Sequence, residues 1–344
     1  MFNRSLLHHR HALKVAFAAA LAFGIGLGVA SSHPAKAATP VHYVVQVGAS
    51  GPANTDLLQF GPATLQVHRG DIITWAIGGF HNVHVGGTAP KELVIAPEVD
   101  GKPLPQINPE VAFPYGAKNG EAFTGTESGS GLIPADQPQA YSLIVDVAAG
   151  TTFSYQCDIH PGMAGNVTVV DDATEIPSPT DVQLQGAAEL GGSVGASLPT
   201  YYEMYGKSSA TMMSKDGTAT VQPGNDVGRA VMNLFFPYTT IIKAGESVSW
   251  TIPATSIEPH TISNPAVYGQ EFNPIEQKNA PPILALGNTL APMTQSGTTV
   301  KMGDTWSSGL ITPGTTFTLT FADAGVYPYV CNIHPGMNGV VVVQ

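Results

Sequence analysis

One seven-residue pattern occurs twice in this chain and limits what it can fold into. Residues 157–163 read CDIHPGM, and residues 331–337 read CNIHPGM. Both copies keep a cysteine, a histidine and a methionine at the spacing C-x2-H-x2-M, and they contain the only two cysteines of the chain. A shared pattern of this length indicates an internal repeat, so we interpret the two loops as equivalent parts of two related domains.

The side chains in these loops are soft metal ligands. A thiolate, an imidazole and a thioether select copper, and a blue-copper site combines them with one further histidine. The predicted loop ligands are Cys157, His160 and Met163 in the first repeat and Cys331, His334 and Met337 in the second. Each loop is too short to offer the second imidazole, which must come from a distant strand.

The second imidazole is sought near the tryptophan strand of each repeat. In the second repeat, His260 is the only other histidine, so its assignment is nearly forced. Four histidines compete in the first repeat, namely His42, His68, His81 and His84. We favour His81, because it occupies the position that matches His260. The odd separation along a strand places His84 on the opposite face, in solvent or behind the ligands.

Other segments repeat in the same order and predict the fold. Each repeat has a short strand, a turn with Gly-Asp or Gly-Glu, and an alternating strand that ends in tryptophan. The matching segments are 60–75 and 236–250, 130–133 and 308–311, and 165–170 and 339–343. We therefore predict an all-β protein with two Greek-key β-sandwich domains in tandem, in which Trp75 and Trp250 fill the cores.

The length of 344 residues suits two domains of ordinary size. We place the first domain at 38–171, a linker at 172–217 and the second domain at 218–344. A short helix or strand is expected within the linker, over 198–207. Two long segments rich in Pro, Gly and Asn, 86–129 and 263–307, are expected to be ordered loops packed against the sandwiches.

The N-terminus reads as a targeting segment. Residues 1–14 are basic, an apolar run follows, and Ala35-Lys36-Ala37 has the form of a cleavage site. Residues 1–37 are therefore predicted to be a signal peptide cleaved after Ala37, which leads to the periplasm or the extracellular space. The alternative is an uncleaved anchor, since the apolar run approaches membrane-spanning length.

With these motifs in place, both repeats resemble plastocyanin/azurin-type cupredoxins, over about 42–170 and 218–344. The short loop with proline after histidine is similar to that of amicyanin. The resemblance implies two type 1 copper ions per chain, one near the end of each sandwich. It also implies that the ring edges of His160 and His334 are the electron port. Asn82 and Thr261, directly after the strand histidines, are expected to hydrogen-bond to the loops.

The function expected from these sites is electron transfer between redox partners. The net charge of −11 argues against nucleic acid and against anionic membrane surfaces, and it favours a redox protein with a neutral or basic docking face. After cleavage of the signal peptide, no stable membrane insertion is expected. Copper storage or delivery is the second hypothesis, although Met204, Met212 and Met213 form only a thin methionine cluster.

A copper enzyme is the third hypothesis, since multicopper oxidases and copper nitrite reductases are also built from linked cupredoxin domains. These enzymes need additional copper centres with several further histidines, usually as H-x-H pairs. No such pair occurs after residue 37, and neither Cys157 nor Cys331 has a histidine neighbour. An open coordination position for substrate is therefore not expected, and the chain is predicted to be no enzyme.

Overall fold

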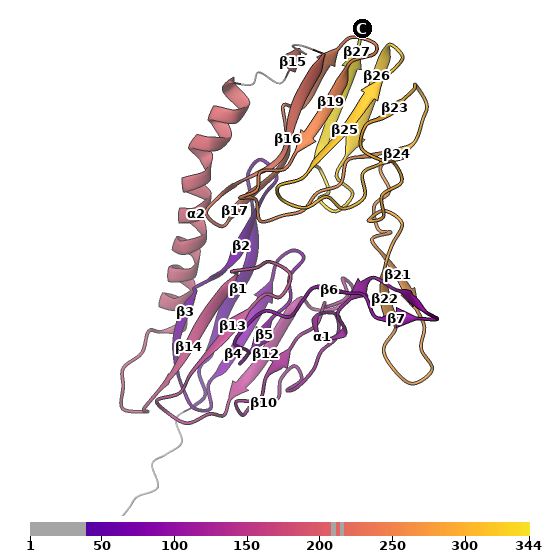
Figure 1. Ribbon diagram of the computed structural model, residues 1–344. Coiled ribbons are helices and arrows are strands. Elements are labelled where there is room, and N and C mark those ends of the chain that lie inside the picture. Colours follow the sequence, from indigo (N-terminus) through magenta and orange to yellow (C-terminus); the bar gives the residue numbers. More distant parts are fainter. Residues whose placement is uncertain (1–38, 208–210, 214–216) are drawn as a thin grey trace, which may run out of the picture. The chain divides into compact units, whose positions relative to one another are not determined.

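The computed structural model describes residues 39–207, 211–213 and 217–344. Strands dominate these residues, and Figure 1 shows the long helix α2 running beside them. Among the described residues, no helix is both long and apolar enough to cross a bilayer. The signal peptide predicted at 1–37 lies outside the described residues and stays a prediction.

The first half is a sandwich of two sheet layers, with strand orders β10-β12-β4-β1-β2 and β11-β5-β13-β14-β3, in which β10 is Ala122–Phe123 and β11 is Ser128–Gly129. The main strands are β1 (His42–Gly51), β2 (Thr55–Gly61), β3 (Thr64–His68), β4 (Ile72–Ile77), β5 (His84–Val85), β12 (Ala140–Val145), β13 (Thr152–Gln156) and β14 (Ala164–Val170). Every second residue of β4 is buried, because alternate side chains of a strand point to one face. Trp75 of β4 meets Tyr155 of the other layer, with ring centroids 5.5 Å apart.

The second half repeats this arrangement, with layers β17-β16-β19-β25-β23 and β15-β18-β27-β26-β20-β24. Its strands are β15 (Thr211–Met213), β16 (Thr218–Val227), β17 (Ala230–Phe236), β18 (Thr239–Ile242), β19 (Ser247–Thr251), β20 (Ser263–Asn264), β23 (Thr298–Val300), β24 (Trp306–Ser307), β25 (Thr316–Phe321), β26 (Gly325–Val330) and β27 (Asn338–Val343). Trp250 is fully buried and meets Tyr329 at 5.1 Å. The predictions of two β-sandwiches and of two tryptophan-centred cores are confirmed.

The two halves share one continuous sheet. Strand β2 pairs antiparallel with β17, in a register that sets Leu57 opposite Ala230 and Thr55 opposite Met232. Side chains reinforce this junction, because Asn54 Nδ2 donates to the carbonyl of Asn233 at 2.8 Å. Backbone and side-chain hydrogen bonds therefore hold the halves together.

Helix α2 (Pro179–Lys207) occupies most of the segment predicted as a linker. It begins with a capping box, in which the Ser178 hydroxyl accepts from Asp181 N and donates to the Asp181 carboxylate. The helix contacts β1 and β2 of the first half and β16 and β17 of the second (Figure 1). The sequence predicted ordered structure only at 198–207, whereas the helix begins nineteen residues earlier.

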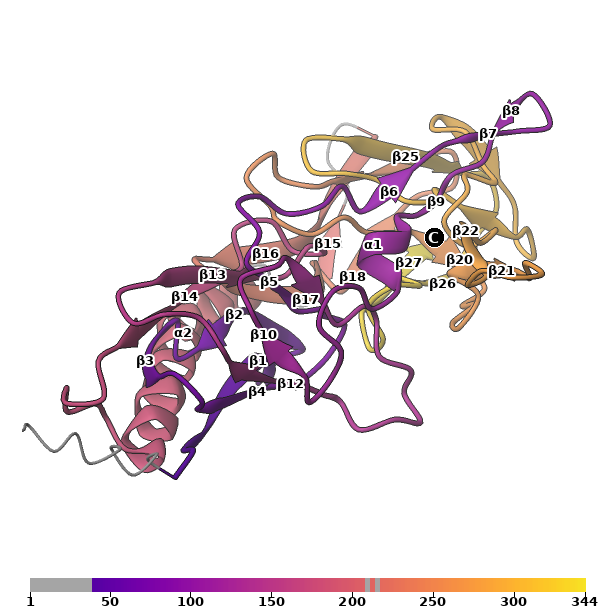
Figure 2. The same ribbon diagram turned by 90° about the horizontal axis from the view of Figure 1, so that it is seen from below.

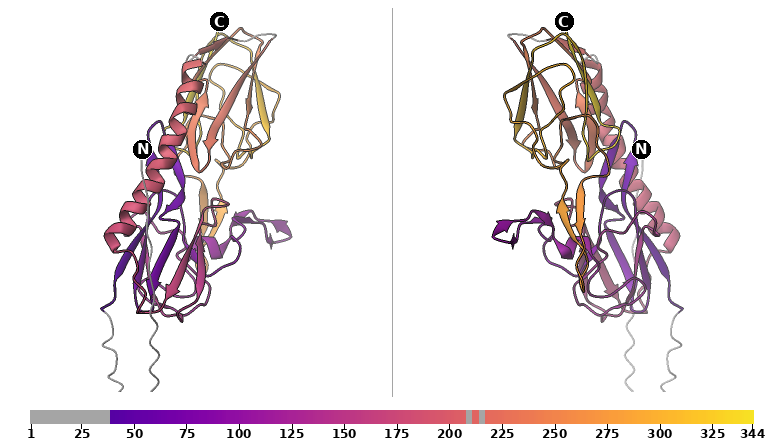
Figure 3. Two further views of the ribbon diagram at one scale, coloured as in Figure 1. Left: turned by 90° about the vertical axis from the view of Figure 1, so that its left-hand side faces the viewer. Right: turned by 90° about the vertical axis from the view of Figure 1, so that its right-hand side faces the viewer.

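The two long segments that were expected to be loops, 86–129 and 263–307, contact each other. They contain β6 (Val94–Ile95), β7 (Glu98–Val99), β8 (Lys102–Pro103), β9 (Gln106–Ile107), α1 (Pro109–Ala112), β10 (Ala122–Phe123) and β11 (Ser128–Gly129) in the first half, and β21 (Phe272–Ile275) and β22 (Ile283–Leu286) in the second. Strand β22 pairs with β9, which makes a four-stranded sheet β21-β22-β9-β6 from both halves. Figure 2 shows α1 beside this sheet, and Figure 3 shows β21 and β22 reaching the first half.

Candidate metal centres

Each strand histidine is held in a space that a glycine leaves open. Strands β1 and β16 carry a register shift at Gly48 and Gly224, which have φ values of 66° and 69°. A Cβ atom at either glycine would overlap Nε2 of the facing histidine, His81 or His260. The glycine therefore fixes the ring on its Nε2 side, and Nδ1 is left to face the copper loop.

The first donor cluster consists of His81, Cys157 and His160, all of them buried. The two Nδ1 atoms lie 2.9 Å apart. The Cys157 Sγ atom lies 3.7 Å from Nδ1 of His81 and 3.6 Å from Nδ1 of His160. Three side chains from two separate loops thus aim their donor atoms at one point.

The second cluster, His260, Cys331 and His334, has nearly the same geometry. Its Nδ1 atoms lie 3.1 Å apart. The Cys331 Sγ atom lies 3.9 Å from Nδ1 of His260 and 3.5 Å from Nδ1 of His334. The structure therefore brings together six of the eight predicted site residues as two matched triangles of donor atoms.

These triangles have the dimensions that a trigonal metal site requires. Bonds of about 2.0 Å to nitrogen and about 2.3 Å to sulfur place the nitrogens about 3.5 Å apart and each nitrogen about 3.7 Å from sulfur. The observed sulfur–nitrogen distances agree with these values, whereas the nitrogen–nitrogen distances of 2.9 and 3.1 Å are shorter, so the rings would move apart slightly around a bound ion. Two imidazoles and one thiolate are also the donor set of a type 1 copper plane.

The remaining two predicted residues, Met163 and Met337, close the copper loops and are buried. Cys157 N donates to the Met163 carbonyl at 2.9 Å, and Met163 N donates to the His160 carbonyl at 3.1 Å. The second loop has the same two bonds, at 3.0 and 3.1 Å. Each methionine is thus tied to the cysteine and the histidine of its own loop.

The donors of the two sites differ in their protonation. Burial lowers the pKa of His81 to about 3, so its ring is neutral and keeps a lone pair. Burial also raises the pKa of the Cys157 thiol to about 11, and a bound metal would have to displace that proton. At the second site burial opposes ionisation of Cys331, but the charge of His334 and hydrogen bonds from His260 and His334 lower the pKa of the thiol.

A polar network lies directly behind the first copper loop. Asp158 N donates to Asn82 Oδ1 at 2.8 Å, and Asn82 Nδ2 donates to the Asp158 carboxylate at 3.0 Å. Nδ1 of His84 lies 2.9 Å from the same carboxylate, and its Nε2 lies 2.5 Å from Glu127. Asn82 therefore makes the expected contact with the loop. His84, one of the four competing histidines, is fully buried behind the ligands.

Thr261 is the corresponding residue at the second site, where it contacts both the loop backbone and the sulfur of Cys331. Asn332 N donates to the Thr261 hydroxyl at 2.7 Å. Thr261 N donates to Cys331 Sγ at 3.4 Å, and its hydroxyl lies 3.9 Å from the same sulfur.

The other two competing histidines of the first repeat lie apart from both clusters. His42 pairs with Thr74 at the surface, and His68 contacts the Thr174 carbonyl.

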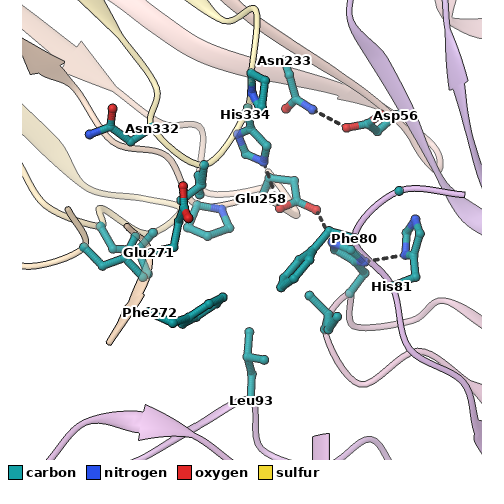
Figure 4. Close-up of a pocket in the computed structure, with 18 of the residues that line it drawn as sticks. Asp56, Phe80, His81, Leu93, Asn233, Glu258, Glu271, Phe272, Asn332 and His334 are labelled. Carbon is teal, nitrogen blue, oxygen red and sulfur yellow. Dashed lines mark hydrogen bonds and ion pairs between the residues drawn. The ribbon is translucent and has the colours of Figure 1, made fainter. Parts of the chain in front are cut away.

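Glu258 stands between the two clusters and was not singled out from the sequence. Its Oε1 atom lies 3.2 Å from Nε2 of His160, and its Oε2 atom lies 3.6 Å from Nε2 of His334. Burial would raise the pKa of Glu258, but the hydrogen bond from His334 and the charges of the neighbouring histidines lower it, so the group is a carboxylate. One carboxylate thus faces the outer nitrogens of a histidine from each site (Figure 4).

The two loop histidines and Glu258 line a cavity of about 590 Å³ between the halves. Apolar side chains form much of its wall, including Phe80, which precedes His81, and Leu93 and Phe272 from the long segments (Figure 4). The ring edges of His160 and His334 were expected to be electron ports. In the structure they face this cavity and Glu258.

A family model decides which proteins these sites resemble. The model of copper binding proteins of the plastocyanin/azurin family matches residues 225–344, which include His260 and the second copper loop. The first half repeats the same donor triangle and the same sandwich. The second half is therefore similar to this copper-binding family. The first half has the same donor set, so both sites suit copper.

Solved structures of amicyanin are similar to part of this chain. Amicyanin from Paracoccus versutus is 21% identical, covering 38% of this chain and 85% of that chain, with a TM-score of 0.23. A Cu(I) form of an amicyanin mutant is 22% identical, covering 38% of this chain and 86% of that chain, also with a TM-score of 0.23.

Proposed function

We propose that this chain is a tandem cupredoxin, an exported blue copper protein that carries electrons, with His81, Cys157, His160 and Met163 holding one copper and His260, Cys331, His334 and Met337 the other. The observation that carries this proposal is the pair of matched His–Cys–His triangles. When bound, each copper would supply a one-electron redox couple. The signal peptide at 1–37 and the resulting periplasmic or extracellular location belong to the same proposal.

The chain's own residues favour electron transfer because they hold the donor atoms still. The backbone at Gly48 and Gly224 packs directly against the rings of His81 and His260, so these rings cannot move away from the other donor atoms. The loop hydrogen bonds from Cys157 and Cys331 to the methionine carbonyls fix the sulfur positions. A donor set that barely moves suits both oxidation states, and little reorganisation then accompanies each electron.

Glu258 provides a direct contact between the two sites. It faces Nε2 of both His160 and His334, which are the ring atoms pointing away from the donor triangles. We propose that electrons exchange between the two coppers along this contact. The chain would then act as one two-electron carrier.

Copper storage and copper enzymes remain the alternatives. Cu(I) storage favours exposed or sulfur-rich donor sets, whereas each triangle here combines two imidazoles with one buried thiolate. Within the described residues, the two triangles are the groups of histidine, cysteine and carboxylate side chains close enough to share a metal ion. We therefore propose no enzymatic activity.

The partner is proposed to be a redox protein with a neutral or basic docking face, given the net charge of −11. Electrostatic attraction of this kind raises association rates at low ionic strength and weakens with added salt. Electron exchange with a basic partner protein should therefore slow as salt is added.

A reductive titration tests the proposed function. The copper-loaded chain should lose its thiolate charge-transfer colour after two electron equivalents, one for each site. Cys157→Ser and Cys331→Ser should each remove one colour and one equivalent and leave the other site intact. Catalytic consumption of dioxygen or nitrite would contradict the proposal, and so would loss of both colours in one single variant.

A further inference from the structure

The cavity beside Glu258 has features of a ligand site that electron transfer between proteins does not require. Its volume of about 590 Å³ falls within the range of about 300–1,000 Å³ that is usual for small-molecule sites. The side chains of His160 and His334 are only 9% and 13% exposed where they line it. Protein partners dock through broad faces of about 800 Å², whereas an enclosed cavity suits a small molecule.

The cavity wall is built to hold an aromatic ring. Phe80 and Phe272 come from different halves and stack with centroids 6.4 Å apart and an angle of 22° between planes. The Phe80 side chain is 52% exposed. Leu93, Ile107 and Leu286 extend the apolar lining. Figure 4 shows Phe80, Leu93 and Phe272 around the open space below Glu258.

One polar group in the cavity lacks a hydrogen bond. The Oε1 atom of Glu258 has no hydrogen-bond partner in the described part of the chain, although the residue is only 7% exposed. Its ion-pair contact to His160 Nε2, at 3.2 Å, leaves lone pairs of the oxygen free. An unmet buried acceptor is costly, so a ligand that donates a hydrogen bond there gains free energy.

These features identify the chemistry of the ligand. Apolar walls and aromatic side chains favour a ring, and a carboxylate favours a hydroxyl donor. Asp56, Glu258 and Glu271 all line the cavity, so an anionic ligand would be repelled. A cation is less suited than a neutral donor, because two histidine nitrogens already face the charge of Glu258.

We propose that this cavity binds a small neutral phenol, with its ring against Phe272 and its hydroxyl donating to Oε1 of Glu258. The bound ring would then lie beside the outer edges of both loop histidines. A redox-active member of the phenol class would be held next to both copper sites. Binding itself requires only side chains of this chain, so the proposal stands apart from the proposed electron transfer.

Calorimetry of the full chain with 2-naphthol tests this proposal. We expect one saturable site per chain, and no binding of the anion 2-naphthoate at the same concentrations. Glu258→Gln should weaken 2-naphthol binding at least about tenfold, because a hydrogen bond to a charged acceptor is stronger than one to a neutral amide. Phe272→Ala should weaken it about tenfold through loss of the ring contact.

Two further variants keep the test decisive. Leu93→Trp fills the cavity and should abolish binding while both copper colours remain. Leu184→Ala, on the exposed face of α2, removes an apolar side chain far from the cavity lining and should leave binding unchanged. Equal binding of 2-naphthoate, or binding that Leu93→Trp leaves intact, would overturn the proposal. Binding by a chain that proved to have no blue copper would refute only the proposed function.

Discussion

At the residue scale, the two copper loops differ at the position after the cysteine. The first has Asp158, whose carboxylate lies in the network with Asn82 and His84. The second has the uncharged Asn332, whose backbone N–H donates to the Thr261 hydroxyl. A nearby negative charge stabilises Cu(II) relative to Cu(I). The first site should therefore have the lower reduction potential.

Exchanging these two residues tests this asymmetry. Asp158→Asn should raise the potential of the first copper by on the order of 50 mV, which corresponds to about 1 kcal/mol for one electron. Asn332→Asp should lower the potential of the second copper by a similar amount. Spectroelectrochemistry of single-site chains measures both changes.

A matched control for this exchange is Asp146→Asn, which removes a surface carboxylate paired with Arg69. It should leave both potentials unchanged. A shift equal to that of Asp158→Asn would mean that overall charge, and not the network behind the loop, sets the difference.

At the element scale, α2 packs against the first half through a close contact between two glycines. A Cβ atom at Gly186 would lie 2.5 Å from the backbone of Gly61, whereas one at Gly191 would meet nothing. Gly186→Ala should therefore lower the free energy of unfolding by about 1–3 kcal/mol, because the helix must move away from β2.

Gly191→Ala is the matched control on the same helix. It should raise the free energy of unfolding by about 0.5–1 kcal/mol, since alanine favours a helix over glycine. Denaturant unfolding of the two variants measures both effects. Destabilisation of equal size by both substitutions would show that the glycine contact does not decide how α2 packs.

The same helix shows where sequence patterns stop being sufficient. The strands could be predicted because apolar and polar residues alternate along them, and the two sandwiches could be predicted because the motif is repeated. Five glycines and Pro199 disfavour a helix at 179–207, and contacts with four strands outweigh them. The capping box at Ser178 and Asp181 was the one local indication of the helix.

At the scale of the whole molecule, the contact between the two sites depends on how the halves meet. Strands β2 and β17 pair, and Arg229 of the second half donates to the Pro161 carbonyl in the first copper loop. The sequence predicted the donor atoms, because a loop motif specifies them. It did not predict Glu258, because the role of this residue arises only when His160 and His334 face each other.

The shared carboxylate predicts that the two coppers influence each other. Reduction of one copper should shift the potential of the other, and by linkage the reverse shift has the same size. Glu258→Gln should reduce this mutual shift, because the charge between the two histidines is lost. Redox titrations of the two-site chain and of the Cys157→Ser and Cys331→Ser chains give the size of this mutual shift in potential. An unchanged shift in Glu258→Gln would contradict the role of Glu258 between the two sites.

The most direct measurement of the central claim is copper content combined with visible and EPR spectra of residues 38–344. We predict two coppers per chain, both with an intense thiolate charge-transfer band and narrow hyperfine splitting. Additional copper with a type 2 signal would contradict the electron-carrier account and indicate an enzyme. Tightly held, colourless Cu(I) at both sites would also contradict it and indicate storage or delivery.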